Sequence, residues 1–95
     1  MDTHANTVEI ATQLIVEIDM SRPLYEIAKE IRNDWKKVSP YALPYLDAMR
    51  ELNSINDDFY CDSGRSVVAY FLSNSTTWKG EVARRVKLEL KEMLK

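Results

Sequence analysis

Only five of the 95 residues are glycine or proline, and this scarcity limits what the chain can fold into. Glycine and proline supply the turns of loop-rich and many-stranded β proteins, whereas helix interiors exclude both residues. Hydrophobic residues make up 45% of the chain and charged residues 29%, a balance typical of globular domains. We therefore expect a single small helical domain over residues 1–95, with a modest core and with residues 1–6 frayed.

Helical periodicity is clearest in the segments 21–38 and 77–95. In the first segment, Pro23 suits an initial helical turn, and apolar side chains then recur at helical spacing up to Val38. The second segment has an equally regular apolar face, which consists of Val82, Ala83, Val86, Leu90, Met93 and Leu94. Both patterns predict amphipathic helices.

Two shorter helices are expected between these segments. Pro40 ends the first long helix, and Pro44 marks the first turn of a helix that runs to Asn53. Another short helix is built on apolar residues such as Val67 and Phe71. Because the connections are short, neighbouring helices should pack antiparallel or at steep angles, so the predicted fold is all-α, a compact bundle of four to five short helices.

Residues 8–20 leave two alternatives open. Their apolar side chains fit a helix with one buried face, and they also fit a strand with alternating sides. The β-branched content favours the strand, and the helical character of the remaining chain favours the helix. A lone strand would need a partner, which a second copy of the chain could supply. We predict a homodimer through this segment, because a short chain has limited cover for so many apolar side chains.

Three aspartates surround the only cysteine, Cys61, in the segment 57–65. Their spacing does not match an EF-hand calcium loop, and one cysteine with one histidine cannot complete a zinc site. A catalytic cysteine would need a neighbouring base, and the only histidine is His4, far away in sequence. We therefore predict neither a metal nor a cofactor, and a small enzyme acting through this loop is the least favoured function.

The same loop enters an apolar helix through Ser63-Gly64-Arg65. Free N–H groups at a helix start can hold an anion, but a phosphate-binding loop has more glycines and a lysine. The favoured interpretation is that Asp62 or Ser63 caps a helix that begins at Arg65 or Ser66.

The charged residues predict separate acidic and basic surfaces. Thirteen basic and fifteen acidic residues give a net charge of −2, so the chain as a whole lacks the basic excess of nucleic-acid modules. One basic stripe of the last helix consists of Arg84, Lys87, Lys91 and Lys95. Such a stripe can follow phosphates, although it is also typical of a solvated helix face. Nucleic-acid association through this stripe is the second functional alternative.

Aromatic residues at segment ends or in loops are candidates for contact with a partner. These residues are Tyr41, Phe59, Tyr60 and Trp78. Such side chains either close a core or form an interface, and the sequence does not separate the two roles. The separated charges and the absence of a catalytic constellation favour a non-enzymatic protein-interaction or regulatory module, whose partner is another protein or a second copy of the chain.

No segment predicts export or membrane insertion. The first ten residues lack a basic region followed by an apolar stretch, and no apolar run approaches the ~18 residues of a membrane span. A single cysteine cannot form an internal disulfide, so nothing implies an oxidising compartment. We therefore expect a cytoplasmic protein without membrane contacts.

Four segments carry a resemblance to known proteins. IRNDWKKV, PYLDAM, DSGRSVVAYFLSN and TWKGEVARRVKLELKEML together resemble small uncharacterised proteins of Gram-positive phages and mobile elements. The resemblance covers residues 24–94. It implies an accessory protein of a phage or its host, and it transfers neither an activity nor site residues.

Overall fold

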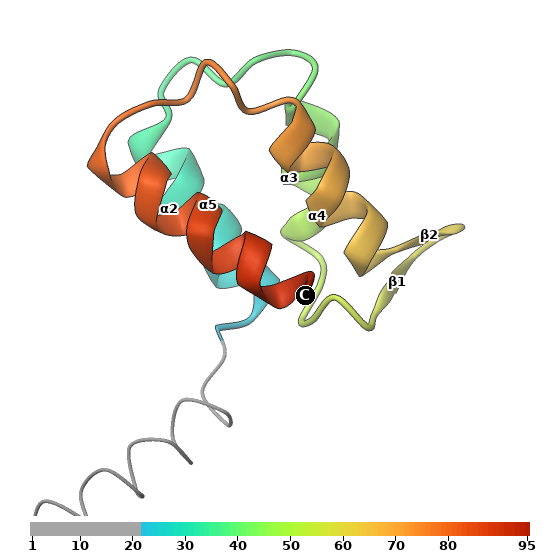
Figure 1. The fold of residues 1–95 in the computed structure, drawn as a ribbon. Helices are drawn as coiled ribbons and strands as arrows, with labels where there is room; N and C mark the ends of the chain where they lie inside the picture. Colours follow the sequence, from blue (N-terminus) through green and yellow to red (C-terminus); the bar gives the residue numbers. More distant parts are fainter. Residues whose placement is uncertain (1–21) are drawn as a thin grey trace, which may run out of the picture.

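The computed structural model describes residues 22–95, and this part contains four helices joined by short connections (Figure 1). The helices are α2 (Leu24–Asp34), α3 (Leu43–Met49), α4 (Gly64–Ser73) and α5 (Glu81–Met93). Two short strands, β1 (Asp58–Phe59) and β2 (Asp62–Ser63), lie between α3 and α4 in the chain. The expectations for residues 1–6 and 8–20, including the homodimer, concern residues outside this described part.

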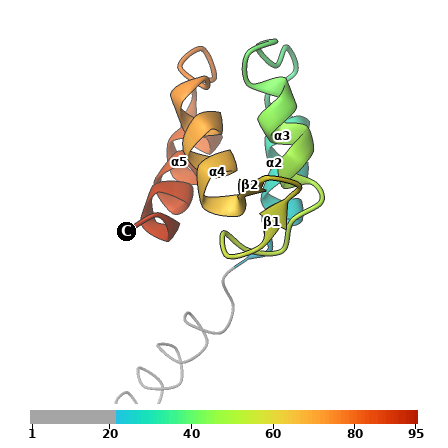
Figure 2. The ribbon, with the colours of Figure 1, turned by 90° about the vertical axis from the view of Figure 1, so that its right-hand side faces the viewer.

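Successive helices run in opposite directions (Figures 1 and 2). Each of them contacts its neighbour in the chain, and α5 returns to contact α2, with the most extensive contact between α3 and α4. The described part is therefore mostly helical, as the scarcity of glycine and proline predicts.

The all-α prediction is wrong in one respect, because β1 and β2 form an antiparallel hairpin. Asp58 pairs with Ser63 and Phe59 with Asp62, and the chain reverses at Tyr60, which has a left-handed φ of 56°. Two-residue hairpin turns favour such positive φ values and usually recruit asparagine or glycine for them. Here a tyrosine occupies the turn, so the residue types that normally predict a hairpin are missing.

Aliphatic side chains from all four helices pack around three aromatic rings in the core. The ring of Trp35 stacks on that of Trp78 at a centroid distance of 5.7 Å, and Phe71 packs edge-on against both. The indole N–H of Trp78 donates to Asp34 Oδ2 at 2.8 Å. The end of α2 is thereby tied to the segment that leads into α5. The prediction that Trp35 and Phe71 belong to the core is confirmed.

Helix α3 is shorter than predicted. Pro44 lies in its first turn as expected, but the helix ends at Met49 rather than at Asn53. The N–H groups of Glu51 and Leu52 donate to carbonyl groups only three residues earlier, which tightens the chain into 3₁₀-type turns.

The segment 52–57, called here the capping segment, closes the start of α2. No side chain caps this helix, so its first N–H groups need other acceptors. The N–H of Leu24 donates to the carbonyl oxygen of Asn53 at 2.9 Å, and that of Tyr25 donates to Leu52 at 3.0 Å.

The capping segment also closes the start of α4. The N–H of Gly64 donates to the carbonyl oxygen of Asp57 at 2.6 Å, and that of Arg65 donates to Ile55 at 2.9 Å. The approach is so close that a Cβ atom on Gly64 would lie 2.6 Å from the Ser54 carbonyl oxygen. Gly64 is therefore required by the contact between α4 and the capping segment.

Replacement of Gly64 by alanine should destabilise the domain by about 2 kcal/mol or more, because the obstructing atoms belong to the backbone and cannot rotate away. Helix propensity alone predicts the opposite sign, since alanine is the better helix former. Urea denaturation of Gly64→Ala measures the change. The control is Ala69→Gly at an exposed position of α4, which should cost about 1 kcal/mol through propensity. A Gly64→Ala protein as stable as the original would contradict the close approach.

Candidate binding surfaces

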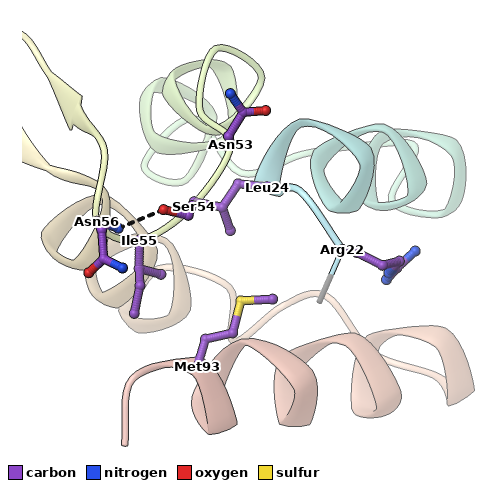
Figure 3. A pocket seen from close by; sticks show the side chains of 7 residues that line it. All are labelled: Arg22, Leu24, Asn53, Ser54, Ile55, Asn56 and Met93. Carbon is purple, nitrogen blue, oxygen red and sulfur yellow. Dashed lines mark hydrogen bonds between the residues drawn. The ribbon is translucent and has the colours of Figure 1, made fainter. Parts of the chain in front are cut away.

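The carboxylate of Asp57 holds the capping segment in shape. Its Oδ2 accepts hydrogen bonds from the N–H of Asn53 at 2.9 Å and of Ser54 at 3.2 Å. The Ser54 hydroxyl in turn accepts from the N–H of Asn56 at 3.0 Å (Figure 3). Asp57 therefore has a structural role, because it turns toward the backbone rather than toward a ligand.

The predicted cap of α4 is confirmed at Ser63. Its Oγ accepts from the N–H of Ser66 at 3.1 Å, and the helix begins at Gly64, just before the expected start at Arg65 or Ser66. The N–H groups of Gly64, Arg65 and Ser66 all donate to protein oxygens. An anion at this helix start would have to displace those bonds, so the structure does not support the phosphate-cradle alternative.

Cys61 is exposed in the turn of the hairpin, beside Tyr60. Within residues 22–95, no three His, Cys, Asp or Glu side chains are grouped in a way that could hold a metal ion. The loop 57–65 thus serves in the described structure to cap and connect helices.

A hollow of about 290 Å³ lies beside the capping segment, at the point where the described chain begins (Figure 3). Ile55 and Met93 face each other across it, and the polar groups of the capping segment form another part of its wall. Among residues 22–95, the only charged side chain that lines it is Arg22, whose guanidinium makes two hydrogen bonds to the Glu89 carboxylate at 2.7 and 3.0 Å. Since that charge is already neutralised, the hollow offers a ligand little to recognise.

Ion pairs connect the start of the described chain to α2 and α5. Arg22 lies 2.9 Å from Glu30, and Glu30 also accepts a hydrogen bond from Arg85. The bond from Arg85, aided by Arg22, lowers the pKa of the Glu30 carboxyl, although partial burial acts in the opposite direction. The two arginines thus favour the charged form of Glu30.

The predicted basic stripe does not form one uniform face. Arg84 and Lys91 are exposed, but Lys87 turns inward and donates to the carbonyl oxygens of Ser75 and Trp78, each at 2.7 Å. Lys95 pairs with Glu92 at 3.1 Å, near the end of the chain. The stripe is therefore not uniform along α5: its positive charge is available near the start of the helix, whereas Glu92 neutralises Lys95 at the end of the helix.

The start of α5 forms a basic hollow of about 320 Å³, called here the basic end. Its walls are Trp78, Lys79, Gly80, Ala83, Arg84 and Lys87. Three of these side chains are basic and none is acidic. Burial, and then the neighbouring charges of Lys91 and Lys79, lower the pKa of Lys87. Burial makes the largest contribution to this shift, and the two neighbouring lysines add to it.

A second basic hollow, of about 330 Å³, lies between the outer face of α2 and the end of α3. This α2/α3 hollow is lined by Tyr25, Lys29, Arg32, Asn33 and Arg50. Three of these five described side chains are basic, and none of the five is acidic. The sequence does not predict this hollow, because Lys29 and Arg32 belong to a helix face that is ordinarily solvated. The one available signal was Tyr25, an aromatic residue on that polar face, which is 45% exposed.

The candidate contact aromatics differ in exposure. Tyr41 is 76% exposed and Tyr60 88% exposed, and both stay available for contacts. Trp78 is only 2% exposed and closes the core, while Phe59 is partly buried against the same core. The sequence left open whether these residues close the core or form an interface, and Trp78 and Phe59 close the core.

The charges of the described part differ from those of the whole chain. All thirteen basic residues lie within 22–95, together with eleven of the fifteen acidic residues. This part therefore has a formal charge of +2, although the chain has −2. The four acidic residues that reverse the sign of the net charge lie in the first 21 positions.

Comparisons with protein-family models, curated proteins and solved structures gave no match. Among residues 22–95, no helix has the length and apolar content that crossing a membrane requires.

Replacement of Asp57 by alanine should destabilise the domain by about 2 kcal/mol, because two backbone N–H groups of the capping segment lose their acceptor. Asp57→Asn should cost less, since an amide oxygen can still accept both bonds. The matched control is Asp58→Ala, which removes an exposed carboxylate from the next residue. Thermal unfolding followed by circular dichroism measures all three variants. Equal losses for Asp57→Ala and Asp58→Ala would show that the carboxylate does not support the segment.

Replacement of Glu30 by glutamine should cost about 1 kcal/mol at neutral pH and less in acid. The folded protein lowers the pKa of Glu30, so its stabilisation is complete above the pKa of an unfolded glutamate. It is lost as the pH falls through the lower folded value. Urea denaturation near pH 7 and near pH 3 tests this, with Glu26→Gln at an exposed position of α2 as the control. A deficit of Glu30→Gln that is equal at both pH values would contradict the ion-pair explanation.

Proposed function

We propose that this domain is a non-enzymatic protein-interaction module, in which a bundle of four helices presents the α2/α3 hollow to an acidic segment of a partner protein. The observation that carries the proposal is the composition of this hollow, in which Lys29, Arg32 and Arg50 surround the half-exposed Tyr25. Tyrosine and arginine are among the residues that contribute most to protein–protein binding.

The contacts of Asp47 indicate what a partner's carboxylate can do in this hollow. Its Oδ1 lies 3.8 Å from Arg32 Nη1 and 3.9 Å from Arg50 Nη1, and all three side chains are exposed. Pairs this long in contact with water contribute little free energy. The two guanidinium groups thus retain donors for an incoming carboxylate, with which they can form shorter, bidentate hydrogen bonds.

Tyr25 adds an apolar surface beside those charges. Its ring can cover the aliphatic part of a bound side chain, while its hydroxyl stays in contact with water. A partner segment that combines carboxylates with an apolar residue would satisfy both parts of the hollow. The positive charges that line the hollow should also accelerate the encounter with such a segment at low salt.

A fluorescein-labelled hexaglutamate peptide provides a direct test with the full chain. Its fluorescence anisotropy should rise with protein concentration, and an Arg32→Ala/Arg50→Ala variant should bind at least about tenfold more weakly, because two charge-assisted contacts are lost. The matched control, Arg65→Ala/Lys95→Ala, removes two positive charges elsewhere and should change the affinity less than threefold. Hexalysine should not bind.

Two outcomes would contradict the proposal. One is the absence of hexaglutamate binding at 50 mM salt and millimolar peptide. The other is an equal loss of affinity in both double variants, which would mean that the peptide responds to net charge rather than to the α2/α3 hollow.

A further inference from the structure

We infer that the basic end is a second, separate binding site, which holds the phosphate backbone of a nucleic-acid duplex without reading its sequence. The inference goes beyond the proposed protein contact, because it uses different residues at a different place on the domain. It rests on how the fold gathers positive charge at the start of α5.

The stacked indole rings bring two distant basic segments to one end of the domain. Lys36 and Lys37 follow Trp35 directly, and Lys79 follows Trp78. Since the two rings stack at 5.7 Å, the connections that contain these lysines lie at the same end of the described part (Figure 1). The connections that follow α2 and precede α5 lie at this end, opposite the described start of the chain (Figures 1 and 2).

The first turns of α5 add Arg84 and Lys87 to this group. Two carbonyl oxygens hold the Lys87 ammonium group in place, so part of the positive charge is fixed before any ligand arrives. Lys79 and Arg84 are exposed, and neither forms an ion pair with another residue of 22–95. Their positive charges therefore stay available to the oxygens of a polyanion.

The acidic groups nearby cancel only part of this charge. Asp34, which is exposed, accepts the hydrogen bond of the Trp78 indole through one of its two carboxylate oxygens. Glu81, in the first turn of α5, is the remaining acidic neighbour in the sequence around the hollow. Three aspartates lie instead in and beside the hairpin, where they would repel phosphate and orient the domain with its basic end toward the duplex.

The aromatic residue at the basic end cannot stack on a base. Trp78 is only 2% exposed, with its ring packed on Trp35 and Lys87 positioned 5.8 Å from the ring centroid. Recognition would therefore consist of contacts from lysine and arginine to phosphates, which carry no sequence information. Such contacts release counterions, so about four of them predict a slope near −3.6 for log affinity against log salt on duplex DNA.

Fluorescence anisotropy with the full chain and two unrelated 20-base-pair DNA duplexes tests the inference at 50, 100 and 200 mM salt. Both duplexes should bind with affinities that agree within about twofold. A Lys79→Glu/Arg84→Glu variant should lose at least about tenfold in affinity at 50 mM salt, and its salt slope should become shallower by about two. Circular dichroism should show an unchanged fold, because both side chains are exposed.

The matched control is Arg65→Glu/Lys95→Glu, which makes the same charge change near the other end of α5. It should reduce the affinity for DNA less than threefold, although Lys95 belongs to the stripe that the sequence suggests. An equal loss in both variants would overturn the inference, as would the absence of DNA binding at 50 mM salt and 100 μM protein.

Competition distinguishes this site from the proposed protein contact. In one outcome, hexaglutamate displaces DNA from the Lys79→Glu/Arg84→Glu protein as readily as from the original protein. This result would place the DNA at the α2/α3 hollow and overturn the inference. In another outcome, hexaglutamate binds the basic end as tightly as the duplex does. The basic end would then be a site for acidic proteins, and this result would also overturn the inference. If hexaglutamate does not bind but DNA does, only the proposed protein contact is contradicted. The two proposals can therefore fail separately.

Discussion

Two helices of this domain begin on the same short stretch of backbone. The carbonyl groups of Leu52 and Asn53 accept from the first N–H groups of α2, and those of Ile55 and Asp57 accept from the first N–H groups of α4. Helix starts must find acceptors for these groups, and here the acceptors come from one segment rather than from two side-chain caps. The tight end of α3, the Asp57 carboxylate and the absent side chain of Gly64 all serve to bring that segment close enough.

The other end of the domain depends on aromatic contacts instead of backbone hydrogen bonds. Trp35 and Trp78 stack, Phe71 packs against their edges, and the indole of Trp78 binds Asp34. The helices are thus fixed at one end by shared backbone acceptors and at the other by a buried ring cluster. The basic end lies beside the ring cluster, because Trp78 belongs to both.

The apolar faces of α2 and α5 could be predicted from the sequence, since periodicity alone determines which side of a long helix is buried. The cap at Ser63 was also predictable, because a side chain performs it. The capping of α2 was not predictable, because every residue type has a backbone carbonyl group and the sequence therefore does not show which residues supply the acceptors. The hairpin escaped prediction for a related reason: its turn places Tyr60 in a left-handed conformation that favours asparagine or glycine.

The predicted basic stripe shows the same limit for a surface. A helical projection places Arg84, Lys87, Lys91 and Lys95 on one face, but it contains no information on the acceptors that other segments offer. The connection before α5 supplies two carbonyl groups that draw Lys87 inward, and Glu92 neutralises Lys95. Lys79, which lies outside the helix, joins the group that results. Positive charge therefore concentrates where the chain folds back on itself before α5. The net charge of the whole chain underestimates this concentration, since four of the fifteen acidic residues lie in the first 21 positions.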